Sequence, residues 1–244
     1  MTQIDMRTFK EVDLKDGTIL VALPSVGLVS TIAATYMISA LEMDQIVAVD
    51  SDEFPPLSMV YGHKPKFPVR VYAATKEKIA CFISEVPLPG RTHRPLARRL
   101  LEWARAQGVS RIVCLEGLPI PGEHTDAELD VWAVGSTDAA NEEIAAAGLH
   151  MLETGMVSGV TGVLLNEGRW ARQGVIALLA EARPFMPDAL AAARLVQAAD
   201  ELLPGVEIDL APLLKEAKEL EAHLQTLKEQ AKPVTAEAPP SLYR

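Results

Sequence analysis

The chain has 244 residues, 49% of them apolar, and a formal net charge of -10 at pH 7. This length and apolar content are sufficient for one sizeable hydrophobic core. The negative charge disfavours nucleic acids and acidic membrane surfaces as partners, because both are polyanions. The first residues contain neither the basic nor the apolar segment of a secretory signal, and this predicts a cytoplasmic protein.

The stretch 18–41 contains no charged residue. Its first part, Ile19 to Leu23, is a short apolar run typical of a buried strand, and Pro24 ends it. Gly27 then allows a tight turn, after which apolar residues recur at helical spacing. The uncharged length would also suit a membrane span, but the proline break and the scattered hydroxyl residues disfavour that alternative. The stretch therefore predicts the first strand and helix of a β-α-β unit.

Strands and helices are expected to alternate along the following residues. The predicted strands are 45–49, 67–74, 78–84, 111–115, 130–134 and 175–180, and the predicted helices are 95–107, 138–147, 162–172 and 188–202. The second and third strands flank a short turn and predict a hairpin. Cys81 and Cys114 lie inside apolar runs and are expected to be buried and reduced. The pattern predicts one α/β domain over residues 1–208.

A different pattern begins at Asp209. Apolar residues step alternately by three and four, as in a heptad seam, at Leu210, Leu213, Ala217, Leu220, Leu224 and Leu227. The seam predicts a long packed helix over 209–231, which joins protomers in a homo-oligomer or packs on its own domain. Residues 232–241 contain three prolines and little apolar bulk, so 232–244 is predicted to be an extended linker with a terminal tail.

Candidate ligand sites lie at predicted strand ends. Glu85 and Glu116 each follow an apolar strand, and both are expected at the carboxyl edge of the sheet, with the glycine-rich turn around Ser158 nearby. The turns at 24–27 and 154–162 are poor phosphate sites, because the first has a single glycine and the second has no Lys or Arg. The basic cluster around His93 is interpreted as a solvated loop.

Neither a metal site nor a cofactor site is predicted. The histidines pair with no cysteine at a spacing typical of metal ligands. The sequence also contains no G-x-S-x-G motif of the kind that places a serine nucleophile between a strand and a helix. We therefore predict neither catalytic residues nor a cofactor.

An ordered set of short motifs resembles the archaeal branch of the proteasome assembly chaperone family over residues 18–227. The motifs are Leu23-Pro24 with Gly27-Leu28-Val29 and Ile32-Ala33, then Phe54-Pro55-Pro56, Ser84-Glu85-Val86-Pro87, Gly117-Leu118-Pro119, Ser158-Gly159-Val160-Thr161-Gly162 and Leu179-Ala180-Glu181. Ser30 and Ala189 depart from the family's usual glycine and proline. The resemblance implies a three-layer α/β fold like that of nucleoside phosphorylases, without the enzymatic residues, and binding to proteasome α-subunits.

The last three residues, Leu242-Tyr243-Arg244, form a hydrophobic-tyrosine-any ending. Such an ending resembles the tail with which proteasome activators dock between α-subunits. The leading hypothesis is a non-enzymatic, proteasome-binding assembly chaperone or activator-like protein that docks this tail. The alternative is an enzyme or binding protein for a nucleoside or phosphate ligand, using a strand-end pocket near Glu85, Glu116 and Ser158.

Overall fold

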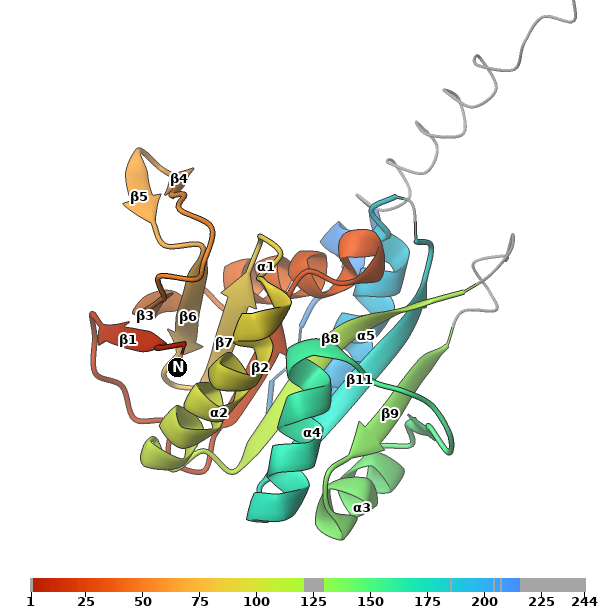
Figure 1. Cartoon of the computed structure of the whole chain (residues 1–244). Helices are drawn as coiled ribbons and strands as arrows, with labels where there is room; N and C mark the ends of the chain where they lie inside the picture. Colours follow the sequence, from red (N-terminus) through yellow and green to blue (C-terminus); the bar gives the residue numbers. More distant parts are fainter. Residues whose placement is uncertain (1, 121–129, 185, 204, 207, 216–244) are drawn as a thin grey trace, which may run out of the picture.

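The computed structural model describes residues 2–120, 130–184, 186–203, 205–206 and 208–215, and these form an α/β domain around one large sheet (Figure 1). In spatial order the sheet consists of β1 (Asp5–Thr8), β3 (Asp44–Asp50), β6 (Val69–Ala74), β7 (Ile79–Ser84), β2 (Thr18–Ala22), β8 (Arg111–Pro119), β11 (Gly174–Ala182), β9 (Val131–Gly135) and β10 (His150–Met151). The central strands β7, β2, β8 and β11 are parallel. A separate small hairpin pairs β4 (Met59–Tyr61) with β5 (Lys64–Lys66).

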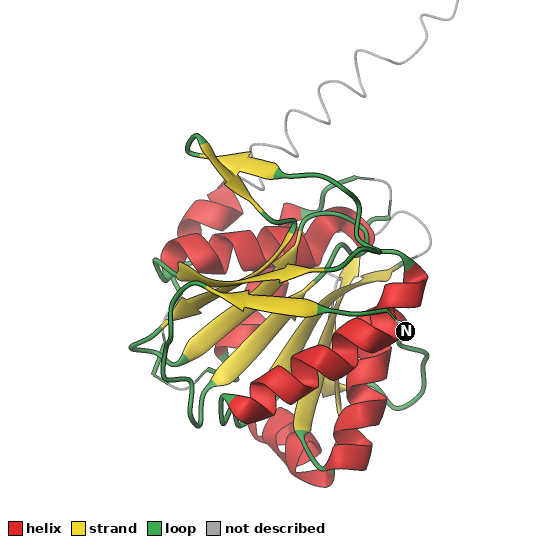
Figure 2. Ribbon diagram, turned by 60° about the vertical axis from the view of Figure 1, so that its left-hand side comes forward, coloured by secondary structure: helices red, strands yellow, loops and turns green. Residues whose placement is uncertain are grey.

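Helices cover both faces of the sheet, so the domain has three layers (Figure 2). The helices are α1 (Val29–Ala40), α2 (Gly90–Ala106), α3 (Asp138–Ala146), α4 (Gly159–Ala171) and α5 (Ala189–Asp200). Buried side chains of α1, α3 and α5 pack on one face, and those of α2 and α4 pack on the other. No helix within the described ranges is both long enough and apolar enough to cross a bilayer.

The charge-free opening stretch forms a buried strand and a helix, as predicted, and the strand lies at the centre of the sheet. All of β2 is buried between β7 and β8. A short 3-10 turn, η1 (Val26–Leu28), then leads into α1, and Gly27 adopts a φ of 62° in it. A Cβ on this glycine would lie 3.1 Å from the Arg183 carbonyl oxygen, so both the backbone conformation and the space favour glycine. The β-α unit is thereby packed against the start of α5.

The predicted hairpin is confirmed, because β6 and β7 pair antiparallel over their whole length. Asp188 caps α5 as predicted, accepting a hydrogen bond from the Ala191 amide at 3.0 Å. Arg183 pairs with Asp188 at 3.0 Å, and although burial opposes ionisation, these contacts hold the pKa of Asp188 below its usual value. Helix α4 ends at Ala171, one residue before the predicted end, and Arg172 caps it in the left-handed region.

Helix α2 begins earlier than predicted. Pro95 was expected at its start, but the helix begins at Gly90 and contains Pro95. The proline lies in the second turn, where it cannot donate the hydrogen bond that residue 95 would otherwise give to the carbonyl of residue 91. Thr92 stabilises the first turn, since both its amide and its hydroxyl donate to the Pro89 carbonyl, at 2.8 and 2.7 Å. The short strands β1, β4, β5 and β10 were not predicted.

The cysteines are buried and free, as predicted, and they lie in different layers. Cys81 on β7 packs in the layer with α1 and α5, and Cys114 on β8 packs in the layer with α2 and α4. Burial raises the pKa of Cys81 to about 12, and burial together with the nearby Glu116 raises the pKa of Cys114 further. Both are therefore thiols at neutral pH.

Candidate functional site

A pocket with a volume of about 800 Å³ lies at the carboxyl ends of the central strands. Its walls come from the end of β2, the η1 turn, the second half of β8, the residues around the start of α2, and the loop that precedes α4. In open parallel sheets this edge is the usual place for a ligand, because the following loops converge there. The pocket therefore occupies the position that the strand-end carboxylates predicted.

Glu116 and Ser158 both line this pocket, as predicted from the sequence. Glu116 lies in β8 and is partly buried, and the Thr161 hydroxyl of α4 donates a hydrogen bond to its carboxylate. Burial raises the pKa of Glu116 to about 7, although the bond from Thr161 opposes the shift. Sequence reasoning missed Thr161, whose position within the glycine-rich motif was the available signal. Glu116 thus changes charge near neutral pH.

The Glu116→Gln variant is expected to be more stable than the parent at pH 8, by about 1–3 kcal/mol. The folded-state pKa of about 7 lies above the ordinary value of 4.5, so the folded state binds more protons between these values. The stability of the parent therefore falls as the pH rises through this window, and glutamine removes that loss. Chemical denaturation from pH 4.5 to 8 measures it, with the exposed Glu142→Gln as control. Parallel pH curves for parent and Glu116→Gln would contradict the assignment.

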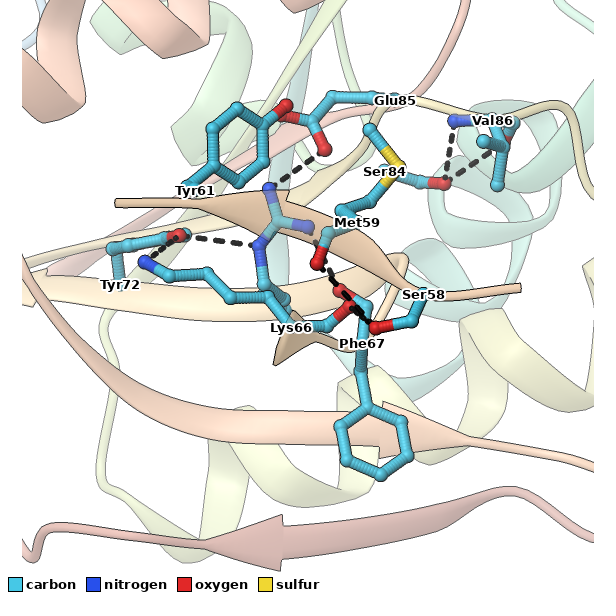
Figure 3. Close-up of polar contacts among 10 residues, drawn as sticks. Ser58, Met59, Tyr61, Lys66, Phe67, Tyr72, Ser84, Glu85 and Val86 are labelled. Atoms are coloured by element: carbon cyan, nitrogen blue, oxygen red, sulfur yellow. Dashed lines mark hydrogen bonds and ion pairs between the residues drawn. The ribbon is translucent and has the colours of Figure 1, made fainter. Parts of the chain in front are cut away.

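Glu85 does not line the pocket described above, and the prediction that it shares an edge site with Glu116 is wrong. Its carboxylate instead pairs with the Arg70 guanidinium at 2.7 Å and accepts a hydrogen bond from the Tyr61 hydroxyl at 2.8 Å (Figure 3). Arg70 lies on β6, so the pair joins the end of β7 to the neighbouring strand, and Tyr61 joins both to the small hairpin. Glu85 therefore anchors structure at this edge.

The Arg70 side chain is only 2% exposed, and each of its three nitrogens donates a hydrogen bond. Besides Glu85, it donates to the Tyr72 hydroxyl at 3.1 Å and to the Phe67 carbonyl at 2.7 Å. Burial, the largest single cause, would lower the pKa of Arg70, but the hydrogen bonds and charges of Glu85 and Tyr72 together outweigh it, and the pKa is raised. Sequence reasoning missed this residue, although a single arginine inside the apolar run Val69–Ala74 was a visible signal.

His93 belongs to α2 and lines the pocket, so its interpretation as part of a solvated loop is wrong. Its Nε2 lies 3.1 Å from the Leu88 carbonyl oxygen, which places a proton on Nε2. The flanking arginines are turned to other partners: Arg91 pairs with Glu53, and Arg94 lies 3.8 Å from Glu167. The basic cluster therefore does not gather around the pocket.

Two glycines beside the pocket allow close packing of its walls. A Cβ on Gly162 would lie 2.3 Å from the Val157 carbonyl oxygen, so the first turn of α4 requires glycine where it meets the preceding loop. At Gly117 a Cβ would lie 2.3 Å from the carbonyl oxygen of Val26, which brings η1 against β8. These glycines position the pocket walls. Within the described ranges, His, Cys, Asp and Glu residues form no cluster of three that would suit a metal ion.

The start of the heptad seam packs on its own domain. Residues 211–215 are helical, and Leu213 is 3% exposed, in the layer with α1 and α5. The Tyr36 hydroxyl of α1 donates a hydrogen bond to the Asp209 carbonyl at the beginning of this segment. The other predicted seam residues, Ala217, Leu220, Leu224 and Leu227, and the tail residues Leu242, Tyr243 and Arg244 lie outside the described residues. The seam and the tail stay predictions.

Comparison with known proteins shows which structures and sequences are similar to this chain. A crystal structure of Pyrococcus furiosus PbaA, an archaeal homolog of proteasome-assembly chaperone, matches with a TM-score of 0.84 and 30% identity, over 93% of this chain and 92% of that one. Pyrococcus furiosus PbaB, an archaeal proteasome activator, shares the fold at 22% identity with a TM-score of 0.80, over 93% and 100% of the two chains. An uncharacterized protein of Methanocaldococcus jannaschii is 25% identical over 93% of each chain.

The family assignment rests on the length of the sequence match. The PAC2 family matches residues 19–228, nearly the range over which the ordered motifs predicted the resemblance. The match and the likeness to PbaA extend over most of the chain and confirm that prediction. The protein belongs to the PAC2 family.

Proposed function

We propose that this protein binds the proteasome core particle, as an assembly chaperone or as an activator-like factor, and has no catalytic activity of its own. The observation that carries the proposal is the likeness to PbaA at 30% identity over 93% of the chain. The pocket residues support the non-enzymatic part, because none of the described lining residues is a Lys or Arg that would hold a phosphate for phosphorolysis. On this proposal, the domain resembles nucleoside phosphorylases in fold and lacks their chemistry.

The contact with the core particle is assigned to Leu242, Tyr243 and Arg244. The linker 232–241 supports this assignment, because ten residues in an extended proline-rich form reach about 30 Å from the domain. Leu242 and the Tyr243 ring supply apolar area, and in a chain that ends at Arg244 the terminal carboxylate pairs with a lysine of the α-subunit pocket. One such tail binds weakly, and several tails on one oligomer bind firmly through effective concentration.

The experiment that tests this function compares the 244-residue chain with a chain that ends at Ser241. The 244-residue chain is expected to co-elute with purified core particles in size-exclusion chromatography, and the truncated chain is expected to elute alone. Circular dichroism of the two chains provides the control for folding. Co-elution of both chains would move the contact to the globular domain, and elution of both alone would overturn the proposed function.

Assembly is assigned to the helix 209–231. If its seam joins protomers, Leu220→Asp buries an unpaired charge, which costs several kcal/mol, and is expected to dissociate the oligomer while the α/β domain stays folded. Leu220→Met keeps apolar volume and is the matched control that should assemble like the parent. Multi-angle light scattering measures the mass. An unchanged mass for a folded Leu220→Asp variant would show that the seam packs within one chain or that association uses another surface.

A further inference from the structure

The strand-end pocket has mostly apolar walls. Six of the side chains that line it are Leu23, Leu88, Leu118, Leu152, Val157 and Leu179, and they come from strands and loops on different sides. The volume of about 800 Å³ lies in the range of pockets that enclose a whole small organic molecule. A single aliphatic side chain from a protein partner would fill only a fraction of it. The shape therefore favours a free small molecule with a sizeable apolar body.

The polar groups of the pocket decide the charge of its occupant. Glu116 and His93 are the ionisable residues among the described lining residues, and these include no Lys and no Arg. An anionic ligand such as a phosphate or carboxylate would thus meet a carboxylate without a compensating permanent cation. A cationic ligand would meet the opposite charge in a partly apolar site, where the attraction is stronger than in water. The charge pattern therefore selects a cation.

From the described residues, the Glu116 carboxylate also accepts fewer hydrogen bonds than an ionised carboxylate can accept. Within the described part of the chain, Thr161 gives the carboxylate its only hydrogen bond, to Oε1, and no residue there forms an ion pair with it. An ionised carboxylate accepts several hydrogen bonds, so Oε2 retains capacity for a donor from the pocket. Arg70 and Glu85 show the contrast within the same sheet, because there a carboxylate at a strand end has its cation built in. At Glu116 the ligand would supply it.

We propose that the strand-end pocket binds a small organic amine, an apolar body that carries a primary ammonium group, with the ammonium donating to Glu116 and the body packed against the leucine and valine walls. The proposal concerns the pocket alone and is independent of core-particle binding through the tail.

The effect of Glu116 on ligand binding has to be distinguished from the effects of other ionisable groups near the pocket. His93 on α2 lines the same pocket and would repel a cation when protonated. Cys114, two residues earlier on β8, is a neutral thiol at neutral pH, as its raised pKa requires. On the neighbouring β11, Glu181 accepts hydrogen bonds from the Trp132 indole and the Asp130 amide, each at 3.0 Å. Glu116 and His93 are thus the two groups to vary.

The test uses three probes with the same indole body: tryptamine, which carries an ammonium group, tryptophol, which is neutral, and indole-3-propionate, which carries a carboxylate. Isothermal titration calorimetry at pH 8 gives the affinities, and methyl NMR of the protein locates the site. Tryptamine is expected to bind at least tenfold more tightly than indole-3-propionate and to shift the methyl signals of Leu118, Val157 and Leu179. With Glu116 titrating near pH 7, tryptamine affinity should rise up to about tenfold from pH 6 to pH 8.

The variants assign this selectivity to its residue. Glu116→Gln keeps the size of the side chain and the acceptor for Thr161, and it should weaken tryptamine at least tenfold, remove the pH dependence, and leave tryptophol unchanged. His93→Gln should retain most of the pH dependence. Equal affinities of the parent for tryptamine and indole-3-propionate, absence of methyl shifts at millimolar tryptamine, or undiminished tryptamine binding by Glu116→Gln would each overturn the proposal. The probe comparison on the parent stands even if a variant fails to fold.

Discussion

Alanine in place of Tyr243 is expected to weaken binding to the proteasome core particle by about 100-fold or more. A tyrosine side chain buries about 150–250 Å² in a pocket, and about 25 cal/mol per Å² gives about 4–6 kcal/mol for the contact. The cost of ordering the tail offsets part of this gain, and about 3 kcal/mol corresponds to about 100-fold. Surface plasmon resonance on immobilised core particles measures the change. Several tails on one oligomer would multiply the loss, since every tail carries the same substitution.

Two control variants separate the side chain of Tyr243 from the end of the chain. Tyr243→Phe keeps the ring and loses only the hydroxyl, so the expected loss is about tenfold. Arg244→Ala is expected to bind nearly as the parent does, because a chain that ends there keeps its backbone carboxylate. Equal binding by Tyr243→Ala and the parent would refute tail docking. A large loss in Arg244→Ala would show that the arginine side chain itself makes the contact.

Alanine in place of Arg70 is expected to destabilise the domain by about 3–5 kcal/mol. The substitution removes a guanidinium that is 2% exposed and leaves Glu85, 16% exposed, without its cation. The Tyr72 hydroxyl and the Phe67 carbonyl lose a donor as well. Urea denaturation at neutral pH measures the cost. A loss below about 1 kcal/mol would mean that water replaces the guanidinium at little cost.

A double substitution tests whether the loss of stability in Arg70→Ala arises from the Glu85 carboxylate that is left without its ion-pair partner. In Arg70→Met with Glu85→Gln neither partner is charged, and most of the stability should return, because replacing both members of a buried pair is far cheaper than removing one. Amide hydrogen exchange gives a second readout. The hairpin β4–β5 should exchange faster in Arg70→Ala, since the Tyr61 hydroxyl is held by the Glu85 carboxylate that Arg70 orients.

The central elements of the sheet were predictable because burial on both faces produces uninterrupted apolar runs. The runs at β2, β7 and β11 are buried at nearly every position, and each was predicted as a strand. The hairpin β4–β5 was not, because its residues are mostly exposed and Pro65 lies within it. Its position depends on Tyr61 meeting Glu85, a contact between residues 24 apart that no local pattern encodes.

The candidate site was predicted in part for the same reason. Glu116 follows an apolar run, and the parallel arrangement of the central strands brings such residues to one edge. Glu85 has the same local signature and a different role, because Arg70 reaches it from the neighbouring strand. His93 was misassigned because Pro95 was taken as a helix start. Strand pairing and helix position, which decide these roles, are long-range properties.

The reactivity of the two buried thiols can be used to measure local opening of the domain. A maleimide or disulfide reagent attacks thiolate, and Cys81 and Cys114 are both covered and protonated in the native fold. Modification therefore requires an excursion that exposes the sulfur, and its rate counts such excursions. Cys81 belongs to one layer and Cys114 to the other. Variants that retain only one of the two cysteines would therefore show whether the two sides of the sheet open together or separately.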